Sequence, residues 1–294
     1  MTFTRLNRTT AGFRLFIAAG VLLLYALLPL SALDDIETTT EISWLTGDMT
    51  ISASAAVPAS AINITTERFR ITEAIDRNLT EIVTGAFSSI YLDSLHTLKE
   101  GFNMDSRMMA EFDNLNLGKN RTSSSISLDL DEVTNIYKYN IYSELIPILT
   151  KHRRTSPPPV LLNYEPTAVF SGIIIYAADP LPYYGESGSG MLNPAVFPKI
   201  FDENMELVAS AGMASPEYLA EWGFILYTDS YDEKQFEERI GLYPFRTTAE
   251  GIFGNNRTDI LITEEAARKI LYNSKNRRLI EEGRIMVITG AELQ

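Results

Sequence analysis

The sequence predicts an α+β protein, with mixed sheets and packed helices in two small domains that follow an N-terminal export signal. Three observations predict this class. Strand-like segments alternate with amphipathic helical segments over 294 residues, without a repeat of fixed period. A proline-rich segment interrupts this pattern near the middle of the chain. A basic N-terminus precedes an uncharged apolar run, as in exported proteins.

The composition indicates a folded, acidic protein. Hydrophobic residues make up 45% and charged residues 21%, which are the proportions of a globular chain. The net charge is −13, and removing the three arginines of residues 1–32, which hold no acidic residue, leaves −16. Such a charge argues against nucleic-acid binding and against docking on anionic lipid. We therefore predict no nucleic-acid partner, and membrane contact only through the N-terminal segment if that segment is uncleaved.

The N-terminal segment predicts export from a bacterial cytoplasm. Arg5, Arg8 and Arg14 form a basic region before an apolar core at residues 15–30, and Ser31-Ala32 offers a cleavage site. We expect a signal peptide at residues 1–32. The alternative is an inner-membrane anchor at residues 15–33, since this stretch is uncharged and nearly long enough to span a bilayer. Both readings place the rest of the chain in the periplasm, because the positive charges come first.

The chain contains no cysteine, which excludes disulfides, thiolate catalysis, zinc–thiolate sites and lipidation at an N-terminal cysteine.

The first domain is predicted at residues 33–152. We expect it to begin with a hairpin at 42–51 around Trp44, with its turn at Gly47-Asp48. A helix capped by Thr65 or Thr66 should then run to about Val83. A strand at 88–98, a helix at 105–115 and antiparallel strands at 123–130 and 134–145 should follow. In the predicted first helix, Ile71, Ile75, Leu79 and Ile82 fall on one face. Met108, Met109 and Phe112 of the second helix are interpreted as core.

A linker is predicted where the basic residues 151–154 meet Thr-Ser-Pro-Pro-Pro at residues 155–159, because consecutive prolines enforce an extended backbone. The second domain is predicted at residues 160–294. Its first half should contain a buried strand at 170–178 and a hairpin of 196–201 and 206–208 with Asn204 at positive φ. A short helix or turn from 216, a strand at 223–227 and a helix at 232–240 with Phe236 and Ile240 inward should follow. We expect the domain to end with a strand at 258–262, a helix at 264–271 capped by Thr263, and a closing strand at 279–288.

Three segments of the second domain carry a family resemblance. They are the strand start at 171–175 (SGIII), the hairpin at 194–204 (PAVFPKIFDEN) and the strand at 258–262 (TDILI). In this order they resemble the bacterial flagellar basal-disk and related outer-membrane lipoproteins, over residues 168–288. The resemblance implies a structural protein of disks and rings around the flagellar motor. The missing lipidated cysteine and the long 180–190 loop depart from the family.

The motifs that suggest catalysis are each incomplete. Residues 185–190 (GESGSG) resemble a nucleophile elbow, but Ser189 occupies a position where glycine is required. His96 and His152, the two histidines, cannot supply a three-histidine zinc site. Residues 129–132 (DLDE) lack the glycine and the final glutamate of a calcium loop. We therefore predict no catalytic residues, no cofactor-binding residues and no metal ligands.

Two functions remain open. The first is a non-catalytic envelope protein that assembles with itself or with other envelope or flagellar proteins. The second is an exported solute-binding protein or hydrolase, with the 180–190 loop over its site. The two differ in whether that loop roofs a deep pocket.

Overall fold

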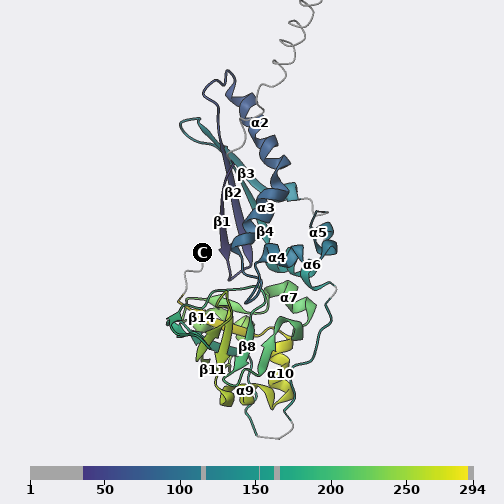
Figure 1. Cartoon of the computed structure of the whole chain (residues 1–294), viewed down its shortest axis with the longest axis vertical. Helices are drawn as coiled ribbons and strands as arrows, with labels where there is room; N and C mark the ends of the chain where they lie inside the picture. The colour runs from purple at the N-terminus through teal and green to yellow at the C-terminus, as the bar shows by residue number, and fades with distance from the viewer. Residues whose placement is uncertain (1–35, 114–116, 152, 162–165, 291–294) are drawn as a thin grey trace, which may run out of the picture.

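The computed structural model has the predicted α+β fold. It describes residues 36–113, 117–151, 153–161 and 166–290. The predicted signal peptide (1–32), the alternative anchor (15–33) and His152 lie outside these residues. The molecule is elongated, with a narrow N-terminal part standing on a broader C-terminal part (Figure 1). No helix in the described ranges is both long and apolar enough to cross a membrane.

The N-terminal part is built on an antiparallel sheet, here called sheet A. Over the described residues its order is β1-β2-β4-β3. The strands are β1 (Glu37–Ser43), β2 (Asp48–Ala56), β3 (Arg121–Ile126) and β4 (Glu132–Asn140). The predicted Trp44 hairpin is confirmed, and Gly47 takes φ +75° in its turn. Strand β4 lies beside β2, so β1 is left at the edge of the sheet.

Alternation along the strands decides which face of sheet A is covered. Met49, Ile51 and Ala53 of β2 are fully buried, whereas Thr50 and Ser52 between them are half-buried. Because successive side chains point to opposite faces, the buried set lies under the helices and the hydroxyl-bearing set lies on the other face. Helices α2 and α3 run alongside the sheet (Figure 1).

The helical elements of the N-terminal part are α2 (Ile64–Arg77), α3 (Leu79–Ala86), η2 (Phe87–Ser89), α4 (Leu98–Asn103), α5 (Ser106–Asp113), η3 (Leu117–Asn120), the π-helix η4 (Ile141–Leu145) and α6 (Ile146–Thr150). The predicted first helix is two helices. Its cap is Asn63, whose side chain accepts from the backbone N–H of Thr66 at 3.2 Å, not Thr65 or Thr66. Asn78 separates α2 from α3 and donates its amide to the Ala74 carbonyl at 3.2 Å.

The predicted strand at 88–98 is wrong. The Asp93 carboxylate accepts from the backbone N–H groups of Leu95 and His96, both at 2.9 Å, and this turns the chain sharply. Thr97 then caps α4 in a reciprocal capping box with Glu100. Tyr91 and Thr97 form an isolated antiparallel β-bridge in this segment, which is not extended into a strand.

The predicted strands at 123–130 and 134–145 both extend too far. Strand β3 ends at Ile126, before the turn at 127–131. Strand β4 ends at Asn140, whose side chain accepts from the Ser143 N–H at 2.9 Å and starts η4. The predicted helix at 105–115 is confirmed as α5, with Phe112 buried.

The C-terminal part contains a parallel sheet and a mixed sheet. Over the described residues their orders are β10-β14-β5-β11 and β12-β13-β8-β9, and β6 pairs with β7. The strands are β5 (Ile173–Ala177), β6 (Leu181–Pro182), β7 (Ser189–Gly190), β8 (Lys199–Asp202), β9 (Leu207–Ser210), β10 (Leu226–Thr228), β11 (Phe245–Thr248), β12 (Gly251–Phe253), β13 (Asp259–Ile262) and β14 (Ile285–Thr289). The helical elements are η5 (Ala211–Met213), α7 (Pro216–Trp222), η6 (Glu233–Phe236), α8 (Glu237–Ile240), α9 (Glu264–Leu271) and α10 (Ser274–Glu281).

The predicted buried strand and the Thr263 cap are confirmed. The strand expected at 223–227 is β10, which begins only at Leu226, and the helix expected at 232–240 is the 3-10 helix η6 followed by α8. Two further details of the C-terminal prediction are wrong. The closing strand begins at Ile285, because Asn273 caps α10 through the Lys275 N–H and the helix continues to Glu281. In the β8–β9 turn the positive φ belongs to Met205, at 62°, not to Asn204. Asp202 organises this turn, since its carboxylate accepts from two backbone N–H groups within it.

The two parts meet in one hydrophobic core, which contains residues from both. Trp44 contacts Tyr227 edge-on, with ring centroids 5.7 Å apart. The Tyr142 ring fills the space beside Gly47 and Gly223, where an added Cβ would lie 2.4 Å and 2.6 Å from it. The linker residues 153–161 form neither helix nor strand. The contacts of Trp44 and Tyr142 therefore fix the orientation of sheet A relative to the C-terminal part.

Candidate functional site

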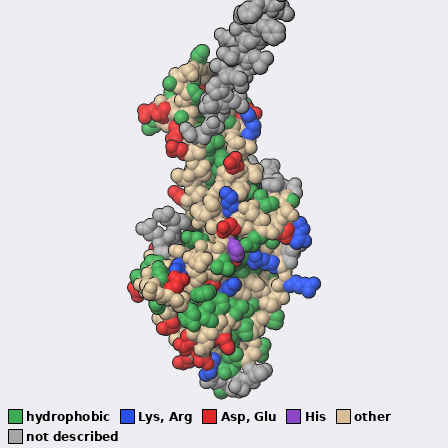
Figure 2. Space-filling model, viewed as in Figure 1, with side chains coloured by type: hydrophobic (Ala, Val, Ile, Leu, Met, Phe, Trp, Pro, Cys, Tyr) green, Lys and Arg blue, Asp and Glu red, His purple; other side chains and the backbone are tan. Residues whose placement is uncertain are grey.

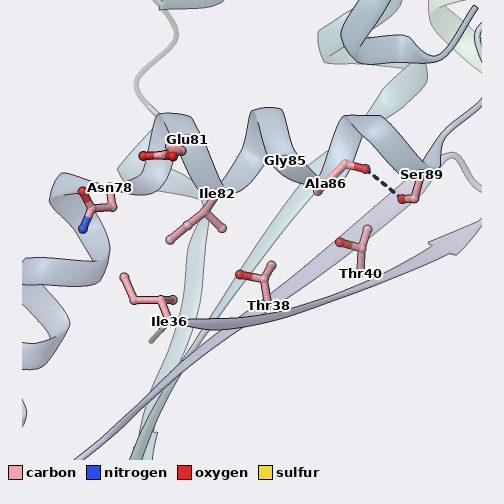
Figure 3. A pocket seen from close by; sticks show the side chains of 9 residues that line it. All are labelled: Ile36, Thr38, Thr40, Asn78, Glu81, Ile82, Gly85, Ala86 and Ser89. Atoms are coloured by element: carbon pink, nitrogen blue, oxygen red, sulfur yellow. Dashed lines mark hydrogen bonds between the residues drawn. The ribbon is translucent and has the colours of Figure 1, made fainter. Parts of the chain in front are cut away.

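A groove runs between the edge strand β1 and helix α3 (Figure 3). We call it the edge groove, and its volume is about 710 Å³. Its lining residues come from the start of β1 and from one side of α3 and its ends: Ile36, Thr38, Thr40, Asn78, Glu81, Ile82, Gly85, Ala86 and Ser89. Most of these side chains are small or uncharged, so the groove can receive another backbone closely.

The local sequence explains both walls. In β1 every second residue faces the helices, which places Thr38 and Thr40 in the groove while Thr39 faces away. On α3, Ile82 and Gly85 lie on the groove side at helical spacing. At Gly85 an added Cβ would meet no heavy atom within 4 Å, so this stretch of the helix flank is open.

The backbone of β1 gives the groove its chemistry. Among the described residues β1 pairs with β2 alone, in an antiparallel register without a bulge from Glu37 to Ser43. An edge strand presents N–H and C=O groups on its unpaired side, which can bond an added strand. A groove between an edge strand and a helix is suited to such strand addition, with side-chain contacts supplying specificity.

A second groove lies at the junction of the two parts. We call it the interdomain groove. Its volume is about 910 Å³, and its lining includes Glu41, Trp44, Asp48, Lys138 and Asp229. Asp229 comes directly after β10, at the carboxyl end of a strand of the parallel sheet. Ligand sites in parallel sheets commonly lie at the carboxyl ends of the strands. The groove carries charges of both signs, but no group of three metal-ligating side chains occurs in the residues that the structure describes.

The 180–190 loop is anchored to the C-terminal part. Its Tyr183 ring lies under the guanidinium of Arg257, at 4.1 Å, and its Glu186 forms an ion pair with Arg257 at 2.7 Å. Tyr184 donates its backbone N–H to Ile252. This ion pair holds the pKa of the Glu186 carboxyl below its usual range. The loop lines neither the edge groove nor the interdomain groove.

The other motifs considered in the sequence lie apart from both grooves. His96 is half-buried, and its Nδ1 lies 3.0 Å from the Asp93 carboxylate in the turn before α4. Residues 129–131 lie in the exposed turn between β3 and β4, and Glu132 is the first residue of β4. Arg153 of the basic segment stacks on the Phe197 ring at 5.1 Å. The structure thus does not bring these residues together.

Charged side chains are distributed over the visible face rather than gathered at a single basic surface (Figure 2). Asp259 is one of the buried ionisable side chains of the C-terminal part, and it is 1% exposed. Burial raises the pKa of its carboxyl, although its Oδ1 accepts from the Lys199 N–H at 2.9 Å. Asp259 lines neither groove, and it holds the start of β8 beside β13.

The residues of the edge groove are not among the site residues that the sequence predicts. Ser89 falls in the strand expected at 88–98, and Thr38 and Thr40 precede the hairpin expected at 42–51. The available signals were the run of threonines in Glu37–Ser43, typical of a strand, and Gly85 within an apolar helical row. Neither reveals that β1 lies at an edge.

Two family models match the chain. Residues 35–147 match the model described as Treponema pallidum Tp0624, N-terminal domain, and residues 172–291 match the model described as Treponema pallidum Tp0624, second domain. No curated protein matches the chain. The chain is therefore similar to these two domains, in the same order. The edge groove lies within the first matched range, and the interdomain groove draws residues from both.

Proposed function

We propose that this chain is a non-catalytic structural protein of the bacterial envelope and that the edge groove is its assembly surface. The observation that carries the proposal is the edge of β1, which pairs with no second strand within the described part of the chain, beside the open flank of α3. Strand addition there would supply main-chain hydrogen bonds without any chemistry on the partner. The rigid junction with the C-terminal part would hold this edge in a fixed direction.

The envelope part of the proposal is supported by the sequence. The basic region before the apolar run at residues 15–30 favours export. The resemblance of residues 168–288 to flagellar basal-disk proteins suggests the flagellar apparatus as the place of assembly. This narrower role is tested by deleting the gene, imaging the motors and measuring swimming. Altered motors would support it, and unchanged motors and swimming would remove it.

The assembly surface is tested by photocrosslinking in intact cells. A photoreactive residue placed at Thr40 should give adducts with a specific protein, identified by mass spectrometry. The control position is Leu128, which is fully exposed in the β3–β4 turn and remote from the groove. Adducts at Thr40 but not at Leu128 would support the proposal. Absence of adducts at Thr40, in a chain that is exported and folded, would contradict it.

The interdomain groove favours a second candidate, an exported solute-binding protein. Its acidic side chains, Lys138 and the edge of Trp44 could hold a small polar solute. A panel of polar solutes would be tested for a rise in melting temperature. A rise in the wild type that disappears in Lys138→Ala would favour this role over the assembly role.

A further inference from the structure

We propose that the strand that occupies the edge groove is β1 of a second copy of this chain, antiparallel to the first, so that two copies of sheet A become one continuous sheet. This inference rests on the proposed function, since it names the partner of the same surface. It commits to one register, with Thr40 opposite Thr40 of the second copy.

The edge of β1 has little of the usual protection against such pairing. Natural edge strands are blocked by proline, charged side chains (especially lysine), bulges or very short length, and of these β1 has only its two glutamates, Glu37 and Glu41. Strand β1 is seven residues long, its sequence ETTTEIS contains neither proline nor lysine, and its register with β2 shows no shift. Its three consecutive threonines favour the extended backbone that a new strand neighbour needs.

The charges of β1 select the register. With Thr40 on the two-fold axis, Glu37 lies opposite Ser43 and Glu41 lies opposite Thr39, so each carboxylate meets a hydroxyl. With Thr39 on the axis, Glu37 would lie opposite Glu41 twice, and like charges directly opposite destabilise a sheet. The sequence of the strand is therefore self-complementary in the Thr40 register.

The flank of α3 leaves space for the second copy. A two-fold axis perpendicular to the sheet keeps the helices of both copies on the same face, so the second α3 would approach the first across the edge groove. The open position at Gly85 and the small side chains of Ala86 and Ser89 line this side. Small residues allow helices to pack closely, and the groove of about 710 Å³ supplies the space.

The absence of cysteine makes a disulfide test specific, because a single introduced cysteine can pair only with that of another copy. In the proposed register, position 40 faces itself at a Cα separation of about 4.5–5.5 Å, within disulfide reach. Position 39 is offset from itself by two residues, at about 8 Å, which is beyond reach. Thr40→Cys and Thr39→Cys are therefore matched variants at neighbouring positions of the same strand.

Both variants of the purified full chain would be oxidised mildly, separated on a non-reducing gel and checked for folding by circular dichroism. We expect at least tenfold more disulfide-linked dimer from Thr40→Cys than from Thr39→Cys, and a dimer of the wild type by light scattering. Equal or greater linkage through position 39 would overturn the register. A wild type that stays monomeric, with no linkage at position 40, would overturn self-pairing. If photocrosslinking at Thr40 then identifies a different protein, the assembly surface stands without self-pairing; if it gives no adduct, both proposals fail.

Discussion

Sheet A and the parallel sheet of the C-terminal part differ in what their strands leave exposed. Every residue of β14, from Ile285 to Thr289, is buried, and β5 is buried at four of its five positions. Strand β1 contains no buried residue. The apolar strands are covered on both faces and form core, as parallel strands do. The Thr-rich strand leaves an edge available for contact. On our proposal, the buried parallel strands contribute stability and the exposed edge of sheet A contributes the contact with a partner.

The first test asks whether the N-terminal and C-terminal parts unfold as one unit. Trp44→Ala removes a 7% exposed indole that contacts Tyr227 across the junction. We expect a loss of about 3–5 kcal/mol in the free energy of unfolding, because truncating a buried aromatic leaves a cavity. The measurement is urea unfolding followed by circular dichroism. Leu45→Ala, at a 51% exposed neighbour, should change stability by less than about 0.5 kcal/mol. Two separate transitions in the wild type would show that the regions fold independently.

The second test concerns how the C-terminal part satisfies a buried charge. Arg239 is 5% exposed, donates to the carbonyls of Trp222, Gly223, Phe224 and Gly283, and lies over the Trp222 ring at 4.9 Å. Burial lowers the pKa of its guanidinium to about 9, so it remains charged at neutral pH. Its removal would leave these carbonyls without their donor.

We expect Arg239→Met to lower the free energy of unfolding by about 2–4 kcal/mol, measured by the same urea titration. Arg268→Met serves as the matched control. Arg268 forms an exposed ion pair with Glu264 within α9, and its loss should cost less than about 0.5 kcal/mol. Equal effects of the two substitutions would contradict the role assigned to Arg239.

The comparison also shows which features can be predicted from the sequence. The apolar run at Ile173–Ala177 and the Thr263 cap were predicted because burial and capping depend on neighbouring residues. The turn after Tyr91 was missed because the Asp93 side chain overrode a strand-like composition. The switch from β4 to a π-helix was missed for a similar reason, since Asn140 caps it.

The edge groove could not be predicted from the sequence, because it depends on strand order. An alternating Thr-rich segment has the same pattern at the edge of a sheet as in its centre. That β1 lies at the edge follows from the pairing of β4 with β2, whose paired residues are 76 to 92 positions apart in the sequence. The open flank at Gly85 likewise depends on how α3 lies over the sheet.

Substitution of Asp259 is expected to raise the free energy of unfolding, by less than the Trp44 and Arg239 substitutions lower it. Burial raises the pKa of this carboxyl in the folded protein, so the folded state binds its proton more tightly than the unfolded state does. The free energy of unfolding therefore falls as the pH rises from the unfolded pKa, about 4, through the folded value.

Asp259→Asn keeps the acceptor for the Lys199 N–H and removes the charge. We expect the variant to be more stable than the wild type at pH 7, with an advantage that shrinks as the pH approaches 4. Melting temperatures across this range would measure it. Asp129→Asn, in the exposed β3–β4 turn, should show no such gain. A variant that is less stable at pH 7 would contradict the assignment.

The smallest effect on stability is expected at the edge itself. Thr40 is partly exposed, so Thr40→Lys should change the free energy of unfolding of one copy by less than about 0.5 kcal/mol. In the proposed register it places two positive charges opposite each other, and we expect at least a tenfold weaker dimer by sedimentation. Thr39→Lys would face Glu41 of the second copy and should not weaken it. Equal weakening by both would contradict the register.

The most direct test is amide hydrogen exchange of the wild type over a hundredfold range of protein concentration. We expect peptides covering Glu37–Ser43 to exchange more slowly as concentration rises, because the outward N–H groups of β1 become paired. Peptides covering Ile173–Ala177 should exchange slowly and equally at every concentration, since β5 is paired on both sides within one copy. Exchange in β1 that does not depend on concentration would contradict the claim that this edge is where copies of the chain meet.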